Sequence, residues 1–228
     1  MKRALFVGDG KHDIGGPEWP TGEPFPARGV VPHLAERVAI FDRANSRALR
    51  WSDIPRLSAS KKGYLHKLRA AQLIAQRHGL DTVVAVVDED NDPSRRDLID
   101  AARAEASGVP AVMGVAVRSI EAWTLGAVTA LAAELRTTAT RLRSKYAAPV
   151  EQLYEGSQKP ELRSKQLLKA LADELAHRPD CLELREAVAA ATDIDELCHH
   201  CPAGFARFVA DLRAHFPARP TPAHPTPA

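Results

Sequence analysis

The sequence has few cysteines, little net charge and no long hydrophobic run. The three cysteines, Cys181, Cys198 and Cys201, are an odd number near the C-terminus, which is a poor basis for a disulfide framework and fits a reducing compartment. The 31 basic and 29 acidic side chains leave a formal charge of +2, which neither indicates a nucleic-acid-binding protein nor excludes a basic groove beside an acidic site. No signal sequence or apolar segment of bilayer-spanning length is present. We therefore expect a cytoplasmic protein that does not bind a membrane.

Two phosphate-related motifs are also incomplete. The glycine-rich stretch "GDGKHDIGG", residues 8–16, lacks the Gly-Lys-Ser/Thr of a nucleotide phosphate loop. The stretch "DEDND", residues 88–92, contains an Asp-x-Asp, but it lacks the following Thr of haloacid-dehalogenase-like phosphatases and lies far from the first predicted strand. These differences argue against a nucleotide phosphate loop and against aspartyl-phosphate chemistry.

What the sequence does contain is an alternation of strand and helix patterns. Runs at 3–7, 81–87 and 110–117 predict strands, and the unbroken apolar character of "DTVVAVV" (81–87) is typical of a parallel sheet buried on both faces. Helices are predicted at 29–41, 64–78, 95–107 and 119–135. The proline- and glycine-rich residues 14–28 predict a long loop. The alternation predicts an α/β fold with a mostly parallel sheet flanked by helices.

After about residue 146 the strand signal ends and only helical patterns follow, at 161–177 and 203–216. The second of these has an apolar stripe that we interpret as core rather than as a partner surface, made of Phe205, Phe208, Val209, Leu212 and Phe216. We predict an α/β domain at 1–146, a helical C-terminal region at 147–216, and a proline-rich disordered tail at 217–228.

Acidic side chains follow the predicted strands. Asp88 and Asp90 end the second one on the same side of the chain, with Glu89 on the other side. Asp9 and Asp13 follow the first strand, and Glu121 lies between the third strand and its helix. Ligands gather at the carboxyl edge of parallel sheets, where a divalent cation such as Mg²⁺, or protonation, relieves the repulsion between carboxylates. The alternative is a solvated acidic turn, in which Asp92 only starts the next helix.

Three stretches resemble a known group of proteins. "LFVGDGKHD" (5–13), "VVDEDND" (86–92) and "RSIEAWTLG" (118–126) are similar to landmarks of the Toprim-fold proteins of the RloB-like and OLD-nuclease-like families, many of them associated with defence against phage. The resemblance covers residues 5 to about 131, and "CPAGFARFVADL" near the end is similar to the terminal helix of the RloB-like branch. It implies a four-stranded, mostly parallel Toprim core, dependence on Mg²⁺ or Mn²⁺, and cleavage of nucleic acid.

The resemblance also implies which residues act. Asp88 and Asp90 match the Asp-x-Asp, and Glu121 matches the acid of "IEAW". Gly8 stands where these families have Glu, so either Asp9 serves in its place or the first acid is lost. Ala127 stands where an Asp would be expected.

The functional hypothesis is a Mg²⁺- or Mn²⁺-dependent nuclease of a prokaryotic anti-phage defence system. Its catalytic and metal-binding residues would be Asp9, Asp88, Asp90 and Glu121, with DNA or RNA as substrate and a partner ATPase or another defence subunit beside it. The rival hypothesis is a non-catalytic Toprim-like subunit that binds nucleic acid or a partner protein. Either of two arrangements would remove the argument for the nuclease and leave only an α/β scaffold: Glu121 on the far side from Asp88, or Glu121 buried against an arginine.

Further polar residues have two interpretations each. Lys11 and His12 either face a phosphate or are exposed turn residues. The Cys-x-x-Cys of Cys198 and Cys201, with Cys181 and His177, either binds zinc or supplies buried small side chains; we favour the second because no other well-spaced pair is present. A set of basic residues either forms solvated helix faces or lines a groove for a phosphate backbone: Arg136, Arg141, Arg143, Lys145, Arg163, Lys165 and Lys169.

Overall fold

The protein folds around one five-stranded sheet. The computed structural model describes residues 1–17, 22–55, 63–90, 92–105, 108–153, 157, 159, 162–177 and 179–217. The strands are β1 (Ala4–Gly8), β2 (Phe25–Pro26), β3 (Arg47–Arg50), β4 (Thr82–Asp88) and β5 (Ala111–Ala116). Their order in the sheet is β2-β3-β1-β4-β5, and every neighbouring pair is parallel except the short antiparallel pair of β2 with β3. The predicted α/β class is confirmed, with one strand more than the resemblance implies.

Helices surround the sheet. The helices of the first half are α1 (Lys11–Ile14), α2 (Val30–Val38), α3 (Tyr64–Arg77) and α4 (Ser94–Glu105). After β5 come α5 (Glu121–Gly126), α6 (Val128–Glu134), α7 (Ala139–Arg143), α8 (Ser164–Ala176), α9 (Leu182–Ala191), α10 (Ile194–His200) and α11 (Phe205–His215). Two 3₁₀ turns, η1 (Arg43–Asn45) and η2 (Val150–Gln152), complete the described elements.

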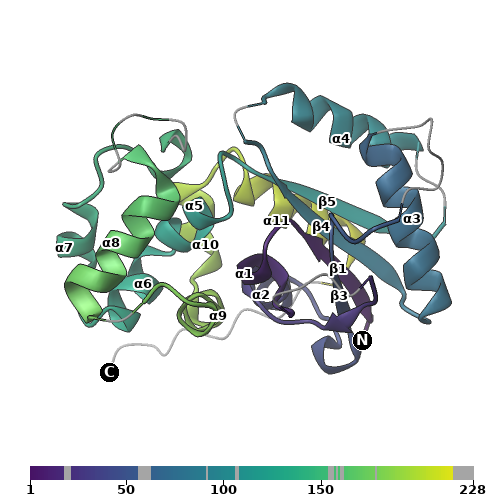
Figure 1. The fold of residues 1–228 in the computed structure, drawn as a ribbon, viewed down its shortest axis with the longest axis horizontal. Helices are drawn as coiled ribbons and strands as arrows, with labels where there is room; N and C mark the ends of the chain where they lie inside the picture. The colour runs from purple at the N-terminus through teal and green to yellow at the C-terminus, as the bar shows by residue number, and fades with distance from the viewer. Residues whose placement is uncertain are drawn as a thin grey trace.

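Alternation along the strands creates two separate cores. On β1, Leu5 and Val7 face the layer formed by α3 and α4, where Leu68 and Ile99 are buried. Ala4 and Phe6 face the opposite layer, which contains α2 and α11 (Figure 1). Because both faces are covered, the parallel strands need apolar side chains at nearly every position. This explains the unbroken apolar run of β4, all of which is buried.

The C-terminal helices return to the sheet. α11 packs on β5, with Phe208 so close to Gly114 that a Cβ atom there would lie 2.7 Å from its ring. Phe205 and Phe208 also contact the Trp123 ring of α5, with ring centroids 5.1 and 5.5 Å away. The apolar stripe of α11 is therefore core, as predicted, and one apolar cluster extends across the predicted boundary at residue 146. The division into 1–146 and 147–216 stays a prediction.

The helix predicted at 119–135 is two helices. Ala127 has a ψ of 59°, which breaks the chain into α5 and α6. Just before the break, Gly126 lies against α10, where a Cβ atom would be 2.8 Å from both Cys201 and Leu197. Glycine lowers helix propensity and permits this close approach, so tertiary packing outweighs the continuous helical pattern.

Two further predictions concern the ends of the chain and membranes. The predicted disordered tail at 217–228 lies outside the described residues except for Pro217, whose carbonyl oxygen accepts a hydrogen bond from the Ile40 N–H (3.2 Å). In the part of the chain that the structure describes, no helix combines the length and the apolar character needed to cross a bilayer.

Candidate acidic site at the carboxyl edge of the sheet

Asp88 is the central acid of the candidate site. It is the last residue of β4 and is buried, with 8 % of the residue exposed. Its Oδ1 accepts a hydrogen bond from the backbone N–H of Ile120 (2.8 Å). Asp88 therefore ties the end of β4 to the start of α5, which places it next to Glu121.

Asp13 enters the site from α1, the turn of helix that follows β1. Its side chain is 7 % exposed, and its Oδ2 accepts a hydrogen bond from the Gly10 N–H (2.7 Å). A Cβ atom on Gly8 would lie 3.0 Å from the Asp13 Cβ and 2.9 Å from the Ile14 side chain. Asp13 thus fills the space that a side chain at position 8 would need, and only glycine fits there.

Glu121 is buried in an ion pair. Its side chain is 6 % exposed, and its Oε1 accepts a hydrogen bond from Arg185 Nη1 of α9 (2.8 Å). Arg185, itself 3 % exposed, also donates to both carboxylate oxygens of Asp180 (2.8 and 2.6 Å). This is the arrangement that removes the argument for an open four-acid nuclease site: Glu121 lies near Asp88, but an arginine holds it.

The second oxygen of Glu121 is different. Oε2 is buried and has no hydrogen-bond partner among the described residues. Leaving a charged oxygen without a partner in the interior is costly, because burial removes its solvation and no hydrogen bond replaces it. The Arg185 pair therefore satisfies only half of this carboxylate.

Electrostatic repulsion is strong in this cluster. Burial raises the pKa of Asp88 to about 9, and the nearby charges of Asp13 and Glu121 add to the increase. The pKa of Asp13 is raised to about 6. Burial is the largest cause, and the negative charge of Glu121 is the second largest. The positive charge of Lys165 offsets only part of the increase in the pKa of Asp88. With no cation bound, Asp88 is therefore protonated at neutral pH.

Asp9 and Asp90 lie at the rim of the cluster. Asp9 is exposed, and its Oδ2 accepts a hydrogen bond from the Asp88 N–H (3.2 Å). Asp90 has a left-handed backbone (φ 49°), and its side chain, 56 % exposed, pairs with Arg95 Nη1 at 2.8 Å. Arg95 also donates to the carbonyl oxygen of Asp88. Of the four predicted site residues, Asp88 and Glu121 are thus buried together, Asp9 is hydrogen-bonded at their edge, and Asp90 is engaged by an arginine.

The donor chemistry of the cluster fits a hard cation, but its present arrangement does not hold one. Carboxylate oxygens are the ligands that Mg²⁺ and Mn²⁺ prefer, and the unpartnered Oε2 of Glu121 is a free donor of that kind. Within the described ranges, however, no group of three His, Cys, Asp or Glu side chains is arranged to hold a metal ion. Binding would require the carboxylates to converge.

The residues with two interpretations are mostly explained by packing. Cys201 is fully buried, and its Sγ is directed at the Ala122 carbonyl oxygen (3.6 Å). Among the described residues, the candidate zinc ligands are not grouped in a way that could hold a metal ion. Arg143 and Lys145 pair with Glu196 and Glu174 (3.5 and 2.5 Å). Lys11 is exposed, and His12 is half-buried with its pKa lowered by burial and by the charge of Arg185.

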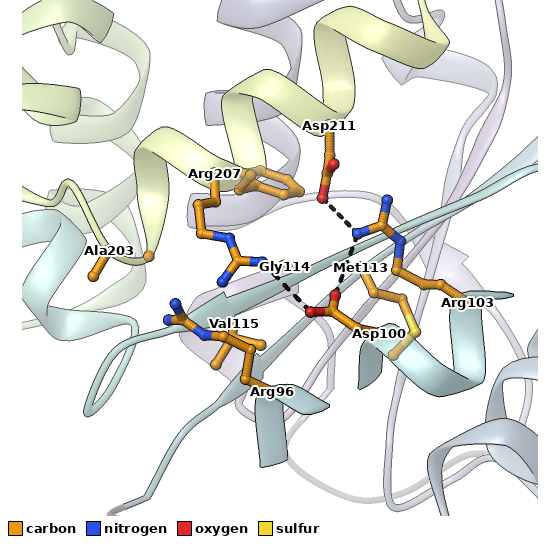
Figure 2. Close-up of a pocket in the computed structure, with 11 residues that line it drawn as sticks. Arg96, Asp100, Arg103, Met113, Gly114, Val115, Ala203, Arg207 and Asp211 are labelled. Atoms are coloured by element: carbon orange, nitrogen blue, oxygen red, sulfur yellow. Dashed lines mark hydrogen bonds and ion pairs between the residues drawn. The ribbon is translucent and has the colours of Figure 1, made fainter. Parts of the chain in front are cut away.

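A second polar feature lies between α4 and α11, beside the edge strand β5. Figure 2 shows Arg103 reaching Asp211 (2.7 Å) and Asp100 (3.6 Å), while Arg207 reaches Asp100 (3.4 Å). The hollow between them has a volume of about 20 Å³, which is room for about one water molecule. We interpret this group as ion pairs that join α4 to α11 beside β5, rather than as a ligand site.

No family model matches the chain, and neither the curated proteins nor the solved structures contain a match to it.

Proposed function

We propose that the protein binds a divalent cation, Mg²⁺ or Mn²⁺, at the carboxyl edge of β1 and β4, and that it acts as a non-catalytic subunit that binds nucleic acid or a partner protein. The observation that carries the proposal is the burial of three acids, Asp13, Asp88 and Glu121, together with a carboxylate oxygen of Glu121 that has no hydrogen-bond partner among the described residues. A divalent ion would relieve the repulsion between these acids without requiring Asp88 to take up a proton.

Asp13 supplies the acid that Gly8 does not. The Toprim-like resemblance expects a carboxylate directly after β1, and Asp13 is a carboxylate of α1 in the space beside Gly8. We therefore propose Asp13 and Asp88 as the principal ligands, with Asp9 at the rim. This assignment replaces Asp9 by Asp13 as the first acid and keeps the Asp88 of the sequence-based hypothesis.

The second candidate function is the nuclease of a prokaryotic anti-phage defence system. The proposed pair of Asp88 and Asp13 favours it, since a cation held there could polarise a phosphodiester. The pairing of Glu121 with Arg185 and of Asp90 with Arg95 weighs against it, because both acids are engaged by cationic side chains. For this reason we place cation binding without cleavage first.

The test of cation binding is thermal stability. In the wild type, Mg²⁺ or Mn²⁺ should raise the melting temperature relative to EDTA, by roughly 5–10 °C at about 100 times Kd. Asp88→Asn should abolish this increase, whereas Asp173→Asn on the exposed face of α8 should leave it intact. A wild-type melting temperature that does not respond to either ion would refute the proposal.

A cleavage assay separates the two functions. The wild type is incubated with single- and double-stranded DNA and with RNA, in Mg²⁺ or Mn²⁺, and compared with the Asp88→Ala, Asp90→Ala double variant. Binding without cleavage, weakening as salt rises, supports a nucleic-acid-binding subunit. Cleavage that the double variant loses would instead establish the nuclease, and a partner ATPase could then be tested by addition.

A further inference from the structure

Arg185 joins two acids, Asp180 and Glu121, and the second belongs to the candidate site. It is carried by α9, which contacts α1, α2, α5 and α6 (Figure 1). Two of its hydrogen bonds go to Asp180 and one goes to Glu121. The bidentate geometry with Asp180 is the stronger half of this arrangement. If Glu121 moved away, the guanidinium would still keep a carboxylate partner.

Glu121 has the complementary position. One of its oxygens binds Arg185, and the other is buried with no partner in the described part of the chain. Glu121 follows Ile120, whose N–H binds the Asp88 carboxylate, and its charge raises the pKa of Asp13 and of Asp88. Glu121 is therefore bound to an internal cation, Arg185, and lies near two further carboxylates, Asp13 and Asp88.

We propose that Arg185 is an internal cation that competes with the divalent ion for Glu121, so that the Asp180–Arg185 pair sets the affinity of the site. This inference rests on the proposed function. A guanidinium offers one positive charge and fixed N–H directions, whereas Mg²⁺ or Mn²⁺ offers two charges and accepts several carboxylate oxygens. When Glu121 turns its carboxylate to the metal ion, Arg185 retains Asp180, and the buried charges on both sides remain paired.

The proposal predicts opposite effects of two substitutions. Arg185→Gln removes the competing charge and should tighten Mn²⁺ binding about tenfold or more. Asp180→Asn removes the other anchor of Arg185, leaves Glu121 as its main carboxylate partner, and should weaken Mn²⁺ binding by a similar factor. A merely structural role of the pair would impair binding in both variants. Arg28→Gln is the matched control. Arg28 pairs with Glu186, which lies on α9 like Arg185, but it forms no ion pair with Glu121 or Asp180 among the described residues.

The experiment is a Mn²⁺ titration of the 228-residue wild type and its variants, followed by isothermal titration calorimetry and by the electron paramagnetic resonance signal of free Mn²⁺. Circular dichroism in EDTA confirms that each variant is folded. Tighter binding by Arg185→Gln together with weaker binding by Asp180→Asn supports the inference. Equal or weaker binding by a folded Arg185→Gln overturns it.

Failure of this inference differs from failure of the proposed function. If the wild type binds Mn²⁺, loses it in Asp88→Asn, and is unaffected by Arg185→Gln, only the role of Arg185 is refuted. If neither the wild type nor Arg185→Gln binds Mn²⁺, the cation site itself is refuted. Should Arg185→Gln fail to fold, Asp180→Asn alone decides, because unchanged or tighter Mn²⁺ binding in that variant contradicts the competition.

Discussion

The backbone N–H of Asp88 donates a hydrogen bond to the Asp9 carboxylate (3.2 Å), which joins the carboxyl ends of the neighbouring strands β1 and β4. Asp9 is thereby fixed beside Asp88, where its negative charge is one of the influences that raise the pKa of the Asp88 carboxyl. The two acids are coupled through both a hydrogen bond and repulsion.

Removing Asp9 should therefore lower the pKa of Asp88. In an Asp9→Ala variant without bound cation, the carboxyl of Asp88 should titrate below its wild-type value of about 9, because one repelling charge is gone. The measurement is a pH titration of the aspartate carboxyl carbons by NMR. Asp97→Ala, an exposed change on α4, is the control and should leave the Asp88 titration where it is.

The stability of the cation-free protein should fall as pH rises. Asp88 and Asp13, with folded pKa values of about 9 and about 6, keep their protons in the folded state above pH 4, where the unfolded chain loses them. Each carboxyl then lowers the free energy of unfolding by up to about 1.4 kcal/mol per pH unit, Asp13 between about pH 4 and 6 and Asp88 between about pH 4 and 9.

Denaturant unfolding in EDTA across this pH range checks the sign. Asp88→Asn should flatten the dependence between pH 6 and 9 and stabilise the cation-free protein at neutral pH, because the amide resembles the protonated acid. A free energy of unfolding that increases from pH 6 to 9 in the wild type would contradict the burial of Asp88.

Gly8 should not tolerate a side chain. A Cβ atom there would lie within 3.0 Å of both Asp13 Cβ and the Ile14 side chain, so Gly8→Ala should cost about 1–3 kcal/mol of stability. Gly8→Glu, which would restore the residue found in the resembling families, should destabilise at least as much and should not add a cation ligand. Thermal denaturation and Mn²⁺ titration measure both effects; a stable Gly8→Glu with tighter Mn²⁺ binding would contradict this prediction.

The ion pairs between α4 and α11 should differ in strength. Arg103 is 23 % exposed and contacts two acids, whereas Arg207 is 54 % exposed and contacts Asp100 alone at 3.4 Å. We expect Arg103→Gln to cost about 1 kcal/mol and Arg207→Gln at most about 0.5 kcal/mol, since exposed pairs contribute little. Chemical denaturation compares the two, and equal losses would show that burial does not distinguish them.

A fragment of residues 1–146 should fail to fold. Without α11, the face of β5 around Gly114 and the ring of Trp123 would lose the apolar cover of Phe205 and Phe208. Circular dichroism and heteronuclear NMR of the fragment test this. A cooperative unfolding transition in the fragment would instead confirm that the predicted domain boundary at residue 146 separates independent units.

Much of the sheet was predictable because local sequence determines it. The apolar runs that became β1, β4 and β5 are long enough to stand out, and Asp88 lies at the carboxyl end of β4, where the sequence pattern places it. β3 was not predicted, because "RALR" has only two buried residues between arginines and becomes a strand through its pairing with β1. β2, only two residues long and containing a proline, gives no signal at all.

The contact of Arg185 with Glu121 could not be predicted either, because it depends on tertiary packing rather than on local sequence. The Arg185–Glu121 contact joins residues 64 positions apart on different helices, and no motif marks it. In the sequence, Arg185 lies in "LELREAVAAA", where an arginine reads as an ordinary charged residue of an amphipathic helix. Only the packing of α9 against α5 turns it into a buried partner of an acid.

The return of α11 to the sheet also has a consequence for biosynthesis. A ribosome synthesises β5 roughly a hundred residues before it synthesises Phe205 and Phe208. At about 5–20 residues per second, the face of β5 around Gly114 therefore stays exposed for seconds during translation. The nascent chain must keep that apolar strand from associating with other polypeptides until its own C-terminal helix arrives. Cellular chaperones that recognise exposed hydrophobic segments should therefore engage this protein before termination more than after it.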